Sequence, residues 1–334
     1  MGVVGEEMPK RLIAESNSIV EALGLSKTFR SRRHGGHIRA VEGVDLAVAP
    51  GETFGLVGPD GAGKTTTIRL LNGLLVPDAG HATVAGYDVI RRSLEVHERV
   101  GYMAQQFSLY GDLSVDENIN FFANVYGIGR AARRERIARL LDFARLGPFR
   151  DRPAAKLSGG MKKKLALACM LVHEPAVVFL DEPTTGVDPV SRREFWDLLT
   201  DLRLEQGLTI LVSTPYMDEA ERCHRVGLMY GGRLVAVGTP AEIKALVPGE
   251  LLELRPTDWQ RAKSLLPGLE GVLEVQTYGE RLHVFVDDAA RRGPQLVQAL
   301  AAHGLACAPP RTIAPRLEEA FVSLIRRHTW EARP

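Results

Sequence analysis

The chain has 334 residues, of which 45% are hydrophobic and 25% charged, and its formal net charge is +1. This composition is ordinary for a globular protein long enough for two domains. The near-neutral balance argues against a dedicated nucleic-acid binder, which would carry a basic surplus. The three cysteines are widely spaced and odd in number, which fits neither a metal site nor a disulfide framework and makes a reducing compartment the expectation: Cys169, Cys223 and Cys307.

No segment has the pattern of a secretory signal or of a membrane span. The first residues include Glu6 and Glu7 and lack a sustained apolar core. The longest apolar runs, such as 176–180, are far shorter than the ~20 residues that cross a bilayer. If the protein works at a membrane, we therefore expect another chain to cross it.

From about residue 20 to residue 238, short apolar stretches alternate with longer amphipathic ones, which indicates an α/β fold. The stretch from about 93 to 156 instead carries long polar–apolar runs, such as 131–145, and is expected to be a mostly helical insertion. The basic segment 30–39 is expected to be a solvated turn. Strands are expected at 53–57, 177–180, 209–212 and 225–229.

After residue 240 the pattern changes to a β-α-β-β-α-β order followed by a last helix, which predicts a small α+β, ferredoxin-like domain. His283, in a strand of alternating polarity, is expected to be a surface residue rather than a ligand. The expected elements are strands at 251–255, 272–277 and 282–286 and near Ala306, and helices at 258–266, 294–303 and 317–327.

Residues 58–65 (GPDGAGKT) match the phosphate-loop pattern G-x-x-x-x-G-K-[ST] between an expected strand and a helical run. The glycines let backbone N–H groups fold around phosphate oxygens, and the helix N-terminus adds its positive dipole. Lys64 would reach the β- and γ-phosphates, and Thr65 would bind Mg²⁺. The flanking strand and helix argue against a chance glycine turn. The predicted nucleotide-binding residues are Gly58, Asp60, Gly61, Ala62, Gly63, Lys64, Thr65 and Thr66.

Two carboxylates, Asp181 and Glu182, follow the apolar stretch 176–180. A buried strand would deliver Asp181 beside Mg²⁺, and Glu182 could polarise the attacking water as a general base. Alone, an apolar strand followed by Asp-Glu usually marks a turn. Together with the phosphate loop it predicts the second half of an ATPase site.

Ser158, Gly159 and Gly160 precede a helical run through 162–164. A hydroxyl and free N–H groups at a helix start can bind an anion, although a serine there can also be a plain N-cap. The order of motifs favours a functional role, because the phosphate loop, the helical insertion, LSGG and the strand ending in Asp-Glu follow one another.

This ordered set resembles the ATP-binding subunits of ABC transporters, over residues from about 20 to 243. The resemblance implies that Phe29 stacks on adenine and that Gln105 touches Mg²⁺ and senses a transmembrane partner. Gln106 is an adjacent alternative to Gln105. Asp188, in the segment 185–188, matches a loop that crosses the dimer interface.

Further segments narrow the resemblance. LSGGMKKKLALA, TPAEI and APRLEEAFVSLI are similar to bacterial drug exporters of the daunorubicin-resistance type. GPDGAGKTT and STPYMDEAE are most similar to the N-terminal half of tandem multidrug-exporter ATPases. The resemblance implies an N-terminal extension (1–19), a P-loop nucleotide-binding domain (20–243) with a helical subdomain at about 93–165, and a regulatory or dimerisation domain (244–334).

The family's mechanism implies a head-to-tail pair in which ATP and Mg²⁺ lie between the phosphate loop of one subunit and the 158–160 segment of the other. Thr65, Gln105 and Asp181 would surround Mg²⁺. ATP binding would close the pair and pull on separate transmembrane permease subunits that export drugs or other small amphiphiles. The chain would then lie in the cytoplasm, peripherally on the inner face of the cell membrane, with no nucleic-acid partner.

Pro215 departs from the family pattern, in which a histidine bonds the γ-phosphate and holds the attacking water. Proline has neither a side-chain donor nor an N–H, and losing one positioned transition-state donor costs on the order of 10²–10³ in rate. Asp60 stands where asparagine is usual, and its repulsion of the triphosphate at ~4–8 Å would be ~1–4 kcal/mol. We therefore expect a chain that binds Mg-ATP, hydrolyses it slowly at its own phosphate loop, and pairs with a second ABC ATPase that has the switch histidine.

Alternatives to this hypothesis remain. Pro215 could be a tolerated turn residue, with another group or water holding the γ-phosphate. The chain could also be a non-hydrolysing regulatory subunit. A soluble ABC ATPase acting on ribosomes or DNA is disfavoured by a single ATP domain, the net charge of +1 and the lack of a heptad tract.

Overall fold

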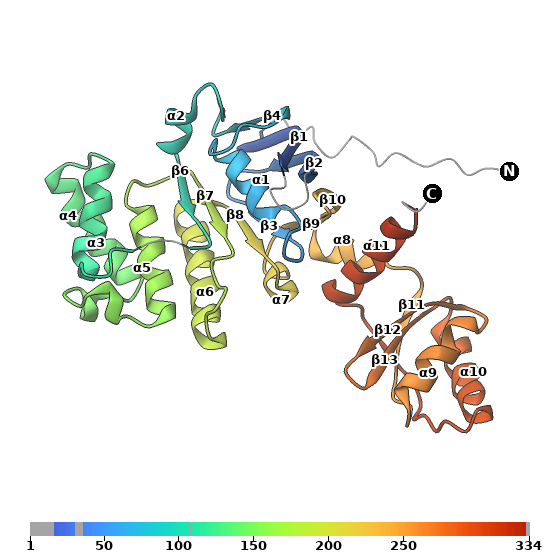
Figure 1. The fold of residues 1–334 in the computed structure, drawn as a ribbon. Coiled ribbons are helices and arrows are strands. Elements are labelled where there is room, and N and C mark those ends of the chain that lie inside the picture. The colour runs from blue at the N-terminus through green and yellow to red at the C-terminus, as the bar shows by residue number, and fades with distance from the viewer. Residues whose placement is uncertain (1–16, 31–35, 107–108, 332–334) are drawn as a thin grey trace. The chain divides into compact units, whose positions relative to one another are not determined.

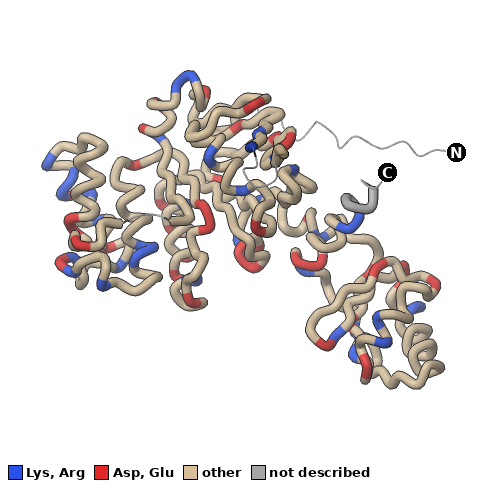
Figure 2. The backbone as a smooth tube through the Cα atoms, in the orientation of Figure 1, with Lys and Arg blue, Asp and Glu red and all other residues tan. Residues whose placement is uncertain are grey.

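The computed structural model describes residues 17–30, 36–106 and 109–331, with side chains up to residue 327. The chain divides into two compact units, of which the first ends at Leu234 and the second begins at Val235. Figure 1 shows the elements of each unit. Basic and acidic segments are interspersed along both units (Figure 2), in keeping with the small net charge. Residues 31–35 of the expected turn lie outside the described residues.

A six-stranded sheet forms the centre of the first unit. Its strands β3, β7 and β8 are buried at every residue, as parallel strands covered on both faces must be. β3 pairs in parallel with β8 and β9, and β7 pairs in parallel with β6 and β8. The strand order is β10 (Arg233–Gly238), β9 (Arg225–Tyr230), β3 (Thr53–Val57), β8 (Thr209–Thr214), β7 (Val177–Asp181) and β6 (Val100–Met103).

A four-stranded antiparallel sheet accompanies the central sheet. Helix α1 (Lys64–Leu71) contacts strands of both sheets, so its buried side chains, such as Ile68, join them in one core. The four strands lie in the order β2 (His37–Val48), β1 (Val20–Arg30), β4 (Ala79–Val84) and β5 (Tyr87–Asp88).

Three helices gather at one end of the first unit (Figure 1), around a core that includes Ile119, Leu141 and Leu165. Ser114 begins the first of them with a capping box: its hydroxyl accepts from the Glu117 N–H, and the Glu117 carboxylate accepts from the Ser114 N–H. The three helices are α3 (Val115–Val125), α4 (Arg130–Phe143) and α5 (Gly159–Leu171).

The expectation of a mostly helical insertion missed one strand. After α2 (Ser93–His97), the chain enters β6, which joins the central sheet beside β7. Four residues are too few to show strand periodicity in a sequence. Gly101 is needed in β6 because a Cβ there would lie 2.7 Å from the Met170 side chain of α5.

Helices α6 (Pro189–Gln206) and α7 (Met217–Ala220) follow β7 and β8, respectively. Asp188 caps α6 by accepting from the N–H groups of Val190 and Ser191, and Gly207 ends the helix in the left-handed conformation. These caps set the first and last residues of α6, the helix that connects β7 to β8.

The second unit has the element order expected from the sequence. Four antiparallel strands lie in the order β12 (Val272–Tyr278), β13 (Arg281–Val286), β11 (Glu250–Leu254) and β14 (Arg311–Ile313). One face of this sheet shares a core with helices α9 and α10, through side chains such as Leu254, Val284 and Leu296. The helices are α8 (Pro240–Ala245), α9 (Trp259–Leu265), α10 (Ala289–Ala302) and α11 (Leu317–Glu331).

Two elements of the second unit begin several residues away from their expected positions. The last strand lies at β14, not near Ala306, where Cys307 makes only an isolated bridge to Pro256. Helix α10 begins at Ala289 rather than at Pro294, because Asp288 caps it by accepting from the Arg291 N–H. Pro294 lies inside the helix, so reading it as the first turn was wrong.

The expected surface position of His283 is also wrong. His283 is 3% exposed, its Nδ1 lies 3.0 Å from Glu319 Oε1, and the Tyr278 ring stacks on it at 5.1 Å. Gln276 Nε2 likewise donates to the Glu319 carbonyl of α11. The last helix therefore covers the polar side of strands that the alternating pattern assigned to solvent.

Among the helices described, none is both long and apolar enough to cross a bilayer.

Acid should weaken the second unit through Glu253. Hydrogen bonds from Arg255 at 2.8 Å and then Arg281 at 2.8 Å hold the pKa of this carboxyl at about 2, below its usual value of 4.5. A lowered folded-state pKa stabilises the fold above pH ~4.5, and this contribution is lost as the pH falls toward 2. Glu253→Gln should melt below the wild type at pH 6, and the gap should narrow from pH 5 to 2.5. Glu280→Gln, in the exposed β12–β13 turn, is the control; a gap independent of pH would contradict the assignment.

Candidate functional site

The loop between β3 and α1 approaches its neighbours so closely that two positions require glycine. A Cβ on Gly58 would lie 2.1 Å from the Met229 carbonyl oxygen. Gly63 has a φ of +106°, and a Cβ there would lie 2.3 Å from the Ala40 carbonyl oxygen. Because only glycine fits both constraints, the loop bends tightly over the carboxyl end of β3.

Lys64, the first residue of α1, turns back into this loop. Its side chain is 3% exposed, and its ammonium donates to the Gly58 carbonyl at 2.8 Å and the Pro59 carbonyl at 3.1 Å. The same nitrogen lies 3.2 Å from Glu182 Oε1. The ammonium is thus held at the mouth of the loop, where it joins the phosphate loop to the carboxylate after β7.

Asp181 ends β7 opposite Ser213 of β8, and only one oxygen of its buried carboxylate accepts hydrogen bonds. Oδ1 accepts from Ser213 Oγ at 2.7 Å and from Thr65 Oγ1 at 3.0 Å. Oδ2 is buried and has no hydrogen-bond partner, and burial raises the pKa of this carboxyl. An unpartnered carboxylate oxygen beside a threonine hydroxyl fits a Mg²⁺ ion that keeps phosphate and water ligands.

No cluster of three or more histidine, cysteine or acidic side chains suited to a metal occurs in the described part of the chain.

Glu182 is held from several sides in a strained conformation. Its φ is +48°, which is uncommon for a residue with a side chain. Its N–H donates to Ser213 Oγ at 3.0 Å, and its Oε2 accepts from Gln105 Nε2 at 2.9 Å and Thr185 Oγ1 at 3.3 Å. The carboxylate is thereby aimed at the phosphate loop rather than at solvent.

Lys64, Thr65, Gln105 and Glu182 line an open cavity of about 420 Å³, whereas Gly58 and Asp181 are not among its described lining residues. The structure brings Phe29 to it from the end of β1, together with Gln105; Gln106 is not among its described lining residues. Three further contributors lie at the start of β2: Ile38, Arg39 and Ala40. No sequence motif marks them, because the pairing of β2 with β1 brings them to the cavity. The predicted residues in the lining are Phe29, Asp60, Gly61, Ala62, Gly63, Lys64, Thr65, Thr66, Gln105 and Glu182.

Other predicted residues do not line this cavity in the chain as described. Ser158 caps α5 by accepting from the Met161 N–H at 3.3 Å. A Cβ on Gly160 would lie 2.5 Å from Ser191 Oγ, so the start of α5 packs directly on the start of α6, which Asp188 caps. The 158–160 segment and Asp188 thus share one surface, apart from the cavity lining.

Pro215 occupies the turn between β8 and α7 and is half-buried. Thr214 Oγ1 accepts from the Tyr216 N–H at 3.0 Å, which closes the turn around the proline. The Gly58 N–H donates to the Thr214 carbonyl at 3.4 Å. This turn therefore lies against the start of the phosphate loop.

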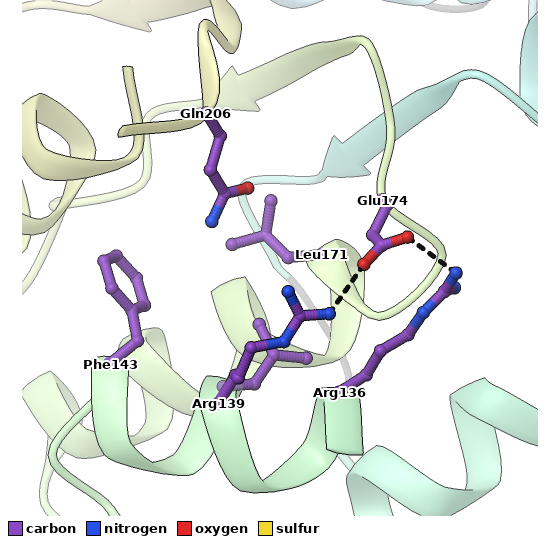
Figure 3. Close-up of a pocket in the computed structure, with 7 residues that line it drawn as sticks. Arg136, Arg139, Phe143, Leu171, Glu174 and Gln206 are labelled. Carbon is purple, nitrogen blue, oxygen red and sulfur yellow. Dashed lines mark hydrogen bonds and ion pairs between the residues drawn. The ribbon is translucent and has the colours of Figure 1, made fainter. Parts of the chain in front are cut away.

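A second, smaller hollow lies beside the C-terminal half of α4 (Figure 3). Arg136 and Arg139 of α4 both pair with Glu174, at 2.6 and 2.9 Å, and Gln206 and Phe143 complete the wall. Because both cations share one carboxylate, this cluster braces α4 against the turn that leads into β7, and we assign it no ligand.

A phosphate loop, a buried lysine and a strand-end Asp-Glu pair on a parallel sheet define a P-loop ATPase. Similar proteins of known family and structure support the same class. Residues 41–185 match the family model described as ABC transporter. The structure of cbiO1 from Clostridium perfringens, part of the ABC transporter complex cbiONQ, superposes with a TM-score of 0.62 and 29% identity, over 69% of this chain and 92% of that chain. The ATP-binding cassette MJ0796, in a dimeric post-hydrolysis state with ADP and Pi, gives a TM-score of 0.60 and 25% identity, over 66% of this chain and 98% of that chain.

Relatives in sequence specify the family further. The Nod factor export ATP-binding protein I of Paraburkholderia xenovorans is 42% identical over 76% of this chain and 83% of the relative. The daunorubicin/doxorubicin resistance ATP-binding protein DrrA of Streptomyces peucetius is 40% identical over 76% of each. The chain belongs to the family of ABC transporter ATP-binding proteins and has the fold of an ABC ATPase.

The chain spans only part of some relatives. The probable multidrug ABC transporter ATP-binding protein YbhF of Escherichia coli (strain K12) is 47% identical over 228 residues, which are 68% of this chain and 38% of the relative.

Gly63→Ala should destabilise the first unit by about 2 kcal/mol or more, because it adds a left-handed strain of ~1–2 kcal/mol per residue to a clash with Ala40. Urea unfolding without nucleotide measures this loss. Gly129→Ala is the matched control: its φ is −62° and a Cβ there meets nothing within 4 Å. Equal stability of both variants would show that the loop does not require glycine at position 63.

Proposed function

We propose that the chain is the ATP-binding subunit of an ABC exporter, which binds Mg-ATP and powers efflux of drugs or other small amphiphiles through separate membrane permease subunits. The cavity lined by the phosphate loop and Glu182, with Asp181 bonded to the lining residue Thr65, carries the proposal. Relatives named for multidrug transport and for daunorubicin/doxorubicin resistance support the class of cargo. The proposed position is the inner face of the membrane.

ATP would bind with its phosphates in the loop and its adenine on Phe29, which is 39% exposed at the cavity rim. Lys64 would exchange its bonds to the loop carbonyls for phosphate oxygens, since an ammonium favours the stronger anionic acceptor. When bound, Mg²⁺ would neutralise charge on the phosphates. Thr65, Asp181 and Gln105 are the residues placed to hold it.

Glu182 is the proposed general base. In the structure its carboxylate is shared between Lys64 and Gln105. As Lys64 turns to the phosphates, one carboxylate oxygen becomes free to orient a water and take its proton. The hydrogen bonds from Gln105 and Thr185 to Oε2 would keep the carboxylate in place meanwhile.

The site is incomplete within one chain. Ser158, Gly159 and Asp188 lie on a surface separate from the cavity lining. A head-to-tail pair would place the start of α5 of one subunit, with its free N–H groups, over the phosphates held by the other. The dimeric state of the similar cassette with ADP and Pi supports this arrangement.

Pro215 is the reason that we assign slow hydrolysis to the chain's own phosphate loop. The turn that contains it packs on Gly58, close to where phosphate would bind, yet proline supplies no donor. The favoured natural arrangement is an asymmetric pair with a second ABC ATPase that carries a histidine there. A non-hydrolysing regulatory subunit is the second candidate, since Pro215 is also compatible with it.

Pro215→His should raise ATP turnover about 10²-fold or more, because it restores one positioned transition-state donor. The measurement is steady-state phosphate release by the purified chain at saturating Mg-ATP. Glu182→Gln in the same background is the control and should remove the gain. Wild-type turnover already equal to that of Pro215→His would show that another group does the work of the histidine.

A complementation experiment tests the head-to-tail pair. One chain would carry Pro215→His with Gly159→Asp, whose added carboxylate repels phosphate; a Cβ at position 159 meets nothing within 4 Å, so the fold should tolerate it. The other chain would carry Lys64→Ala. Each chain should be inactive alone. The mixture should hydrolyse ATP at least 10-fold faster than either chain alone, because it contains one intact composite site.

Gly129→Asp replaces Gly159→Asp in the control, because position 129 is equally open; that chain should be active without mixing. Full activity of the Gly159→Asp chain by itself would contradict a shared site.

A further inference from the structure

Glu219 is a buried carboxylate that the proposed chemistry does not use. It lies in α7 and is 1% exposed. Its two oxygens have different partners: Oε1 accepts from Thr184 Oγ1 at 2.5 Å and Oε2 accepts from Thr214 Oγ1 at 2.6 Å. Burying a carboxylate is costly unless it is well bonded, so this bridge is a specific feature of the fold.

The two threonines belong to the two loops that matter for hydrolysis. Thr184 lies two residues after Glu182, in the loop that leaves β7. Thr214 ends β8 immediately before Pro215, and its hydroxyl also accepts from the Tyr216 N–H at 3.0 Å. One carboxylate therefore ties the loop of the proposed base to the turn that occupies the histidine position.

Arg192 of α6 supplies the charge that balances this carboxylate. Its Nε lies 3.6 Å from Glu219 Oε1, and its guanidinium lies 4.3 Å from the centre of the Tyr216 ring. Asp218, which is largely exposed, lies 3.7 Å from the same guanidinium. Arg192 thus contacts both the Glu219 carboxylate and the Tyr216 ring of the turn.

We propose that Glu219 is a positioning residue for ATP hydrolysis, which keeps residue 215 and Glu182 at a fixed distance and orientation by bridging Thr214 and Thr184. This inference rests on the proposed function. Glu219 does not line the nucleotide cavity among its described residues, so it would act through the two loops. Its loss should lower turnover and leave the affinity for ATP unchanged, since the phosphate loop and Phe29 have no bond to it.

The bridge can be cut at one end without removing the buried charge. Thr184 is 1% exposed, so Thr184→Val keeps its volume and removes only the hydroxyl, whereas Thr184→Ser keeps the hydroxyl. In the Pro215→His chain, Thr184→Val should lower kcat about 10- to 100-fold with KM for ATP unchanged, because small misplacements of reacting groups have effects of this size. Thr184→Ser should retain most of the rate. Equal kcat for the valine and serine variants would overturn the inference.

Hydrogen exchange in the otherwise wild-type chain tests the bridge independently of turnover. Thr184→Val should speed exchange about 10-fold not only in its own loop but also at the Tyr216 N–H, which it does not touch. A purely local role for Thr184 would leave Tyr216 unchanged, and that result would overturn the inference. Thr184→Ser is the matched control, since it keeps the hydroxyl and should leave exchange at Tyr216 at the wild-type rate.

The two hypotheses fail in different ways. If Pro215→His gives no gain in turnover, the proposed impairment is wrong, and exchange at Tyr216 alone decides the role of Glu219. If the gain appears and Thr184→Val neither lowers it nor changes exchange at Tyr216, the impairment stands and Glu219 has no positioning role.

Discussion

The parallel pairing of β7 with β8, in which Asp181 lies opposite Ser213, is the constraint on which the arrangement of the site depends. Because of this pairing, one hydroxyl bonds to two consecutive residues: Ser213 Oγ donates to the Asp181 carboxylate and accepts from the Glu182 N–H. β8 also pairs with β3, so Val57, the last residue before the phosphate loop, lies opposite Thr214. The carboxyl ends of three parallel strands thereby meet at one edge, which is where α/β folds place ligands.

Three acidic side chains are buried at or beside this edge, and each has its own donors. Asp181 is bonded by two hydroxyls, Glu182 by an amide and an ammonium, and Glu219 by two threonines. Without such partners each burial would cost several kcal/mol. The consequence is a closely bonded polar cluster, in which the proposed mechanism requires only Lys64 to change partners.

The sequence predicts best what local chemistry dictates. Strand 53–57 was placed to the residue, because a buried apolar run ends at a glycine that no other residue can replace. Prediction was poorest where distant segments decide: Ile38 and Ala40 reach the cavity only through pairing of β2 with β1, and His283 is buried only because α11 covers its strand. The Glu219 bridge was equally invisible, since Thr184 and Glu219 are 35 residues apart.

Pro215 separates what the fold needs from what the proposed chemistry needs. The turn after β8 is held by the Thr214 hydroxyl, the Tyr216 N–H and the Glu219 carboxylate, and none of these belongs to residue 215. A proline there leaves every one of these bonds in place, and its fixed φ suits a turn. The turn therefore keeps its hydrogen bonds with a residue at position 215 that offers no side-chain donor. An asymmetric pair would need this combination, because the rigid turn still supports a shared interface while hydrolysis depends on the other subunit's site.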